Sequence, residues 1–101
     1  MTKEERSKYA LDIIQNADEE KPIKASSLAI MWKTTARGVR DVVMSLRIAG
    51  EPICSNDNGY WYATEVKQME ETVRRIRAHA LKELKAMSKM AKVLRENGYK
   101  L

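Results

Sequence analysis

The chain has 101 residues, 44% of them hydrophobic and 33% charged, which allows one compact domain and excludes a second independent core. Residues 1–64 carry nine basic and nine acidic residues, whereas residues 65–101 carry ten and five, so the net charge of +5 arises in the C-terminal third. A basic balance favours polyanionic partners such as nucleic acid, but many proteins that bind no nucleic acid reach this charge.

The first predicted element is a helix that begins at Thr2 and ends near residue 18. Thr2 and Glu5 match a capping box, in which the threonine hydroxyl accepts the amide of Glu5. Apolar residues then recur at helical spacing, namely Tyr9, Ala10, Ile13, Ile14 and Ala17. Pro22 stops this helix, and Ile23 is an isolated apolar residue in an extended segment.

Two further helices follow, separated by about three residues. The first is short and is marked by Ala25, Leu28, Ala29 and Trp32. Thr34 and Thr35 then supply a break and a capping hydroxyl. The next helix ends at Gly50, and its inner face is formed by Val39, Val42, Val43 and Leu46.

A β-hairpin is predicted after Gly50, because the helical spacing gives way to strand-forming residues at 52–55 and 59–63. Asn58 and Gly59 are expected to supply the positive φ angles of a tight turn. Alternate residues of a hairpin point to opposite faces, so Trp61 is expected in the core. Cys54 is expected to be a small buried hydrophobic residue.

A long amphipathic helix is predicted to begin after the capping residue Thr64 and to end at Asn97-Gly98. At about 1.5 Å per residue it spans roughly 45 Å, which is more than so small a domain can cover. Its apolar stripe therefore predicts a seam between two copies, formed by Ile76, Ala80, Leu84, Met87, Ala91 and Leu94. The chain divides into a domain at residues 1–64 and an oligomerisation helix at residues 65–101.

Helix, extended residue, helix, tight turn, helix and hairpin is the element order of a winged helix-turn-helix domain. The predicted fold class is mainly α with a small β-hairpin, a winged helix-turn-helix followed by a long C-terminal helix. The segments 26–29, 35–40, 46–55 and 59–63 resemble small winged helix-turn-helix proteins of phages and prophages of Gram-positive bacteria. The resemblance covers residues 22–80 and implies DNA binding, as in repressors and replication-module factors.

In helix-turn-helix proteins the N-terminal residues of one helix contact base edges in the major groove. If Val39, Val43 and Leu46 face inward, Arg37 and Arg40 lie on the groove side, where a guanidinium can bond two guanine acceptors. The predicted DNA-binding residues are Lys33, Thr34, Thr35, Arg37, Arg40, Met44, Arg47, Ser55, Asn56 and Asn58. Of these, we expect phosphate contacts from Lys33, Thr34, Thr35 and Arg47.

Three features depart from the usual pattern. Gly38 interrupts the groove-facing helix, where it is expected to permit close approach to DNA. Lys33 occupies a position that is often glycine, so a wider turn is expected there. The wing of such a domain would be the hairpin region at residues 51–62. This region contains Glu51 and Asp57 and no basic residue, so it cannot neutralise phosphate by itself.

The leading hypothesis is a non-catalytic, double-stranded DNA-binding protein that acts as a homodimer through its C-terminal helix, as a transcriptional regulator or a replication accessory. The acidic wing motivates an alternative, a winged-helix module that binds a protein in a phage replication or host-takeover complex. A third hypothesis is a coiled-coil subunit with the domain as an end cap. The basic face of the long helix is either a second phosphate-binding surface or a solvated face.

The sequence argues against an enzyme and against a membrane protein. It contains no nucleophile motif, no glycine-rich phosphate loop and no residues in metal-ligand spacing, so no cofactor or metal is expected. His79 is expected to be a surface residue. Because no apolar run approaches about 20 residues, because the N-terminus is charged, and because Cys54 is a single cysteine, we expect a cytoplasmic protein without a membrane partner.

Overall fold

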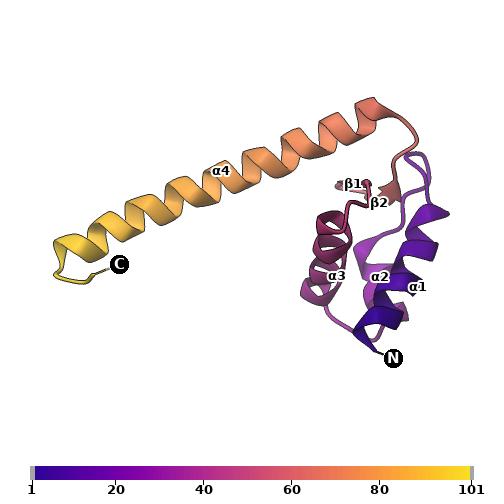
Figure 1. The fold of residues 1–101 in the computed structure, drawn as a ribbon, viewed down its shortest axis with the longest axis horizontal. Coiled ribbons are helices and arrows are strands. Elements are labelled where there is room, and N and C mark those ends of the chain that lie inside the picture. Colours follow the sequence, from indigo (N-terminus) through magenta and orange to yellow (C-terminus); the bar gives the residue numbers. More distant parts are fainter. Residues whose placement is uncertain (1, 101) are drawn as a thin grey trace.

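A computed structural model describes residues 2–100. The elements in chain order are α1 (Lys3–Gln15), α2 (Ala25–Met31), α3 (Ala36–Ile48), β1 (Ile53–Asn56), β2 (Gly59–Tyr62) and α4 (Val66–Glu96). Figure 1 shows α1, α2, α3 and the hairpin gathered into one body from which α4 projects. The prediction of a mainly helical chain with a small antiparallel hairpin and a long C-terminal helix is confirmed.

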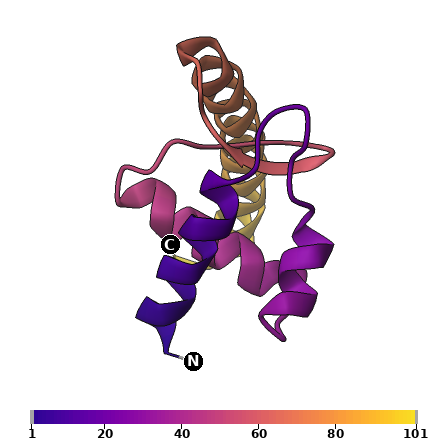
Figure 2. The same cartoon turned by 90° about the vertical axis from the view of Figure 1, so that its right-hand side faces the viewer.

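The core lies where the three short helices meet the hairpin (Figure 2). The inner face predicted for α3 is confirmed, because Val39, Val43 and Leu46 are buried and Val42 is half-buried against the core. The other members of the core cluster are Ala10, Ile14, Leu28, Trp32 and Ile53. Cys54 and Trp61 are also buried, as the hairpin pattern predicted.

Helix α1 begins as predicted but ends sooner. The hydroxyl of Thr2 accepts the amide of Glu5 at 3.1 Å, which caps the first turn. The helix ends at Gln15 and not near residue 18. Asn16 donates its side-chain amide to the carbonyl of Asp12, and the following turn is closed by Asp18 and Lys21, whose main chains bond to each other. These local hydrogen bonds replace the helical ones that the apolar spacing predicted.

Ile23 adds an isolated antiparallel bridge to the hairpin. Ile23 and Tyr60 exchange both main-chain hydrogen bonds at 2.8 Å. The backbone at Gly59 approaches so closely that a Cβ there would lie 2.4 Å from the carbonyl oxygen of Ile23. Gly59 has a φ of 141°, whereas the prediction of a positive φ for Asn58 was wrong. The pairing of Asn56 with Gly59 leaves Asp57 and Asn58 as the two turn residues, and Asn56 accepts the Asn58 amide at 2.8 Å.

The turn between α2 and α3 is tight, so the expectation of a wider turn was wrong. Lys33 adopts a φ of 50°, the left-handed conformation that glycine usually provides at a helix end. The amide of Thr34 donates to Ala29 at 2.9 Å and that of Lys33 donates to Ile30 at 3.2 Å. This is the hydrogen-bond pattern of a Schellman motif, which holds α2 and α3 at a fixed angle.

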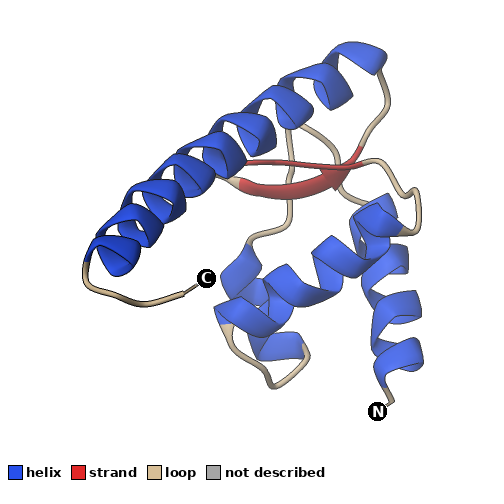
Figure 3. Cartoon of the chain, turned by 60° about the vertical axis from the view of Figure 1, so that its left-hand side comes forward, coloured by secondary structure: helices blue, strands red, loops and turns tan. Residues whose placement is uncertain are grey.

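Helix α4 packs against the hairpin by its first turns, so that the hairpin lies between α4 and the three short helices (Figure 3). The prediction that Thr64 caps this helix was wrong. The N-cap is Glu65, and Gln68 reaches back to accept the amide of Thr64 at 3.0 Å. The amide of Ser55 donates to the hydroxyl of Thr72 at 3.4 Å, which ties α4 to β1. Among residues 2–100, no helix combines the length and the apolar composition needed to cross a bilayer.

Candidate nucleic-acid interface

The outer face of α3 is exposed along its length. Because Val39 and Val43 are buried, Arg37, Arg40 and Met44 fall on the opposite side of the helix and are exposed to solvent. Within the part of the chain that the structure describes, neither arginine forms an ion pair. Two guanidinium groups on successive turns are therefore available to an external acceptor.

The start of α3 is shaped by Thr34 and Thr35, which have different roles. Thr35 caps the helix, since its hydroxyl accepts the amide of Gly38 at 3.1 Å. Thr34 is half-buried and packs against Gly38, where a Cβ would lie 2.1 Å from the Thr34 hydroxyl oxygen. The expectation that Gly38 makes room for DNA is corrected here, because the space is taken by Thr34 of the same chain. Lys33 and Thr35 remain exposed next to this turn.

Arg47, which was predicted to contact phosphate, makes two hydrogen bonds within the chain. Its Nε donates to the carbonyl of Ile53 at 2.9 Å, and its terminal nitrogen donates to the hydroxyl of Ser55 at 3.0 Å. Desolvation by burial lowers the pKa of Arg47, but a guanidinium remains charged at neutral pH. Arg47 therefore ties the end of α3 to β1, and Ser55, also a predicted DNA contact, is its partner.

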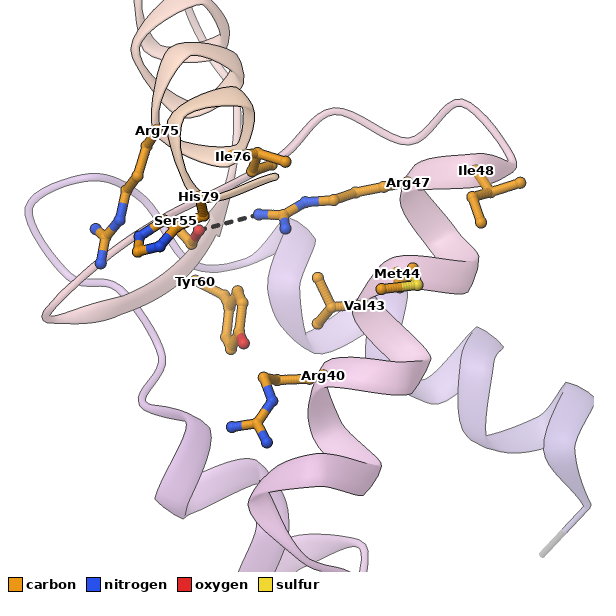
Figure 4. A pocket seen from close by; sticks show the side chains of 10 residues that line it. All are labelled: Arg40, Val43, Met44, Arg47, Ile48, Ser55, Tyr60, Arg75, Ile76 and His79. Carbon is orange, nitrogen blue, oxygen red and sulfur yellow. Dashed lines mark hydrogen bonds between the residues drawn. The ribbon is translucent and has the colours of Figure 1, made fainter. Parts of the chain in front are cut away.

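A groove of about 530 Å³ runs between α3, the hairpin and α4 (Figure 4). One end is cationic and is lined by Arg40 and Arg75, with Tyr60 between them. Exposed apolar side chains line the groove as well, because Met44 and Ile48 of α3 and Ile76 of α4 are 60%, 81% and 42% exposed. The groove therefore combines anion-binding and apolar surface within reach of the outer face of α3.

The acidic tip of the hairpin is neutralised by a cation from α4. Arg75 donates to the carboxylate of Asp57 at 2.7 Å. Glu51, the other acidic residue of this region, accepts the hydroxyl of Tyr62 at 2.9 Å. Asn56 and Asn58 are exposed at the tip, so the hairpin presents polar groups beside a basic helix.

Most of the predicted seam on α4 is uncovered. Leu84, Met87 and Leu94 are exposed, as are Ile76 and Ala80, whereas Ala91 is buried within the chain itself. Exposed apolar residues also lie outside the predicted stripe, namely Leu81, Met90 and Val93. The exposed apolar surface of α4 is thus wider than the predicted stripe.

Cys54, the single cysteine of the chain, is buried. Burial raises the pKa of the Cys54 thiol, so this cysteine is held in its unreactive, protonated form. Among residues 2–100, no group of three or more His, Cys, Asp and Glu side chains is placed to hold a metal ion. The arrangement is suited to binding through cations and apolar contacts.

Two residues that join α4 to the rest of the chain, Arg75 and Gln68, were not singled out from the sequence. Arg75 was one of several basic residues on α4, and its spacing does not reveal that it meets the hairpin tip. Gln68 accepts the indole N–H of Trp61 at 3.2 Å and donates to Glu19 at 2.7 Å. A polar residue in the first turn of an amphipathic helix was the only indication of Gln68 in the sequence.

Comparison of the chain with protein-family models, curated proteins and solved structures finds no match, so the candidate interface is defined by the residues of this chain alone.

Proposed function

We propose that the chain is a non-catalytic, double-stranded DNA-binding protein of phage or prophage type, with a winged helix-turn-helix domain in which α3 enters the major groove and the hairpin is the wing. The supporting arrangement is the tight α2–α3 turn, the outward face of α3 and the hairpin extended by Ile23. The observation that carries the proposal is the exposure of Arg37 and Arg40 opposite the buried face of α3.

The proposal is tested on duplexes selected by the purified protein from a random pool. We expect Arg37→Ala and Arg40→Ala each to weaken binding by about 1 to 3 kcal/mol and to relax base preference, because a bidentate contact to guanine is lost. Fluorescence anisotropy with matched and mismatched duplexes measures both effects. Lys8→Ala, which removes an exposed cation from α1, is the control and is expected to leave binding unchanged.

Salt dependence gives a second measurement. Contacts to about six phosphates predict a loss of affinity on the order of 10³-fold between 50 and 200 mM salt, through counterion release. Absence of any binding at 50 mM salt, with the protein folded, would contradict the proposal. The proposed activity is cytoplasmic and regulates transcription or supports replication of the phage or host genome.

We propose further that the protein acts as a homodimer through α4. The second half of α4 projects beyond the body (Figure 1), and α4 carries the exposed Leu84, Met87 and Leu94. An isolated helix of this length is marginal in water, and pairing with a second copy would bury this surface. A two-fold dimer presents two α3 helices to a palindromic site.

The exposed apolar side chains that line the groove favour a second candidate, a winged-helix module that binds a protein of a phage replication or host-takeover complex. Ile48, Met44 and Ile76 form a surface that base edges do not require. A folded wild-type protein that shows no DNA binding at low salt, but binds a partner protein with little dependence on salt, would favour this candidate over the first.

A further inference from the structure

The ion pair between Asp57 and Arg75 joins the tip of the hairpin to the third turn of α4. Their side chains are 95% and 40% exposed, so the pair is well solvated and contributes little to stability. Arg75 has five donor N–H groups in a planar fork, of which the carboxylate of Asp57 occupies one side. A second anion that reaches this site therefore competes with Asp57 for a cation already held in place.

A second groove is lined by polar residues of the hairpin tip and its neighbours. It is lined by Lys24 and Ser26 from the start of α2, by Asn56 and Asn58 from the turn, and by Arg75. Arg75, Ser55 and Tyr60 line this groove and also the one that reaches Arg40. The two grooves together place cations from α2, α3 and α4 around a hairpin that has none of its own.

We propose that Arg75 and Lys24 bind a DNA phosphate beside the hairpin, and that this phosphate displaces Asp57 from Arg75. The inference rests on the proposed DNA-binding function and adds a residue of α4 to its interface. A guanidinium binds the two oxygens of a phosphate as readily as those of a carboxylate, and Asp57 is exposed enough to return to water. The wing would thus obtain from neighbouring elements the positive charge that its own sequence lacks.

The test compares single variants with the wild type on one selected duplex and on one unrelated duplex, by anisotropy from 50 to 200 mM salt. We expect Arg75→Ala and Lys24→Ala to weaken binding to both duplexes and to lower the slope of log affinity against log salt by about 0.9 each. The ratio of wild-type to variant affinity then shrinks about 3.5-fold over this range of salt. Asp57→Asn is expected to bind both duplexes more tightly, because Arg75 is released and a negative charge is removed.

Arg74→Ala is the matched control, because Arg74 is the adjacent arginine but pairs with Glu70 on the exposed side of α4. It is expected to leave affinity and slope unchanged, and Arg75→Lys is expected to restore the slope that Arg75→Ala loses. Wild-type affinity and slope in Arg75→Ala, or weaker binding in Asp57→Asn, would overturn the inference. If Arg37→Ala and Arg40→Ala weaken DNA binding in the same experiment, the proposed function stands without this inference about Arg75. If the wild type binds neither duplex, both fail.

Discussion

Trp32 and Trp61 are buried to the same extent, 4% exposed, but differ in what their indole N–H groups meet. Trp61 donates to Gln68 at 3.2 Å. The Trp32 nitrogen is buried and has no hydrogen-bond partner within the described residues. A buried donor without a partner costs free energy of folding, whereas a satisfied one contributes modestly to it.

This difference predicts unequal effects of the same substitution. Trp61→Phe and Trp32→Phe remove similar volumes, but only the first removes a hydrogen bond and only the second removes an unsatisfied donor. We expect Trp61→Phe to lower the free energy of unfolding by at least about 1 kcal/mol more than Trp32→Phe. Urea denaturation of both variants measures it. Equal losses, or a larger loss for Trp32→Phe, would show that the hydrogen bond to Gln68 does not contribute to stability.

Gly38 illustrates a second effect at this scale. Glycine inside a helix costs about 1 kcal/mol relative to alanine, but here a Cβ would collide with Thr34. We expect Gly38→Ala to fail to stabilise the wild-type chain and to stabilise the Thr34→Ala variant by about 1 kcal/mol. Thermal unfolding of the four members of this double-mutant cycle gives the coupling energy. A coupling near zero would mean that Thr34 does not enforce the glycine.

At the scale of elements, the attachment of α4 to the hairpin depends on polar groups buried in its first two turns. Gln68 and Thr72 are buried, and Gln68 bonds to residues of β2, of the segment before α4 and of the segment after α1. One side chain therefore sets the position of α4 relative to three parts of the body.

Replacing Gln68 tests this attachment. Gln68→Met keeps the length of the side chain but leaves the Trp61 indole and the Thr64 amide without their acceptor, so we expect a loss of about 1 to 3 kcal/mol in the free energy of unfolding. Lys67→Met, on the exposed side of the same turn, is expected to change stability by less than about 0.5 kcal/mol. Equal stability of the two variants in chemical denaturation would contradict the proposed role of Gln68.

At the scale of the whole molecule, the chain is elongated. Its extents are 52 × 34 × 22 Å and its radius of gyration is 16.7 Å, against about 13 Å for a compact chain of 100 residues. The larger radius of gyration comes from α4, whose second half projects beyond the body (Figure 1). The hydrogen bonds and the ion pair that join α4 to the body all lie at or before Arg75.

Truncation after His79 follows from this distribution. The fragment 1–79 retains Gln68, Thr72 and Arg75, so we expect it to unfold cooperatively, as judged by circular dichroism. It lacks most of the exposed apolar surface of α4, so it is expected to be monomeric in sedimentation at concentrations where the proposed dimer of the full chain would form. An unfolded fragment would instead support the hypothesis of a coiled-coil subunit with a dependent cap.

A matched pair of full-length variants separates the seam from the rest of α4. Leu84→Glu places a charge on the exposed apolar stripe and is expected to abolish dimerisation, whereas Lys85→Glu, on the opposite face, is expected to leave it intact. Sedimentation of both at the same concentration measures the difference.

The sequence alone determined the features that depend on neighbours in the chain. Helical spacing predicted the inner face of α3, the capping hydroxyls of Thr2 and Thr35 were both correct, and the hairpin fell within one or two residues of its observed strands. It also indicated that Arg37 and Arg40 lie outward, because their direction follows from the buried face of a single helix. Local propensity and periodicity contain this information without knowledge of the tertiary structure.

Only the tertiary structure decided which polar side chains were free. Arg47 is bound to β1, Asp57 is paired with Arg75 18 residues away, and Gln68 meets Glu19 at a separation of 49 residues. Such contacts depend on how separate elements pack, and a charged residue looks the same in sequence whether its partner is solvent or another part of the chain. Packing and hydrogen bonding between distant segments thus attach Arg47 to β1 and place Arg75 at the hairpin tip.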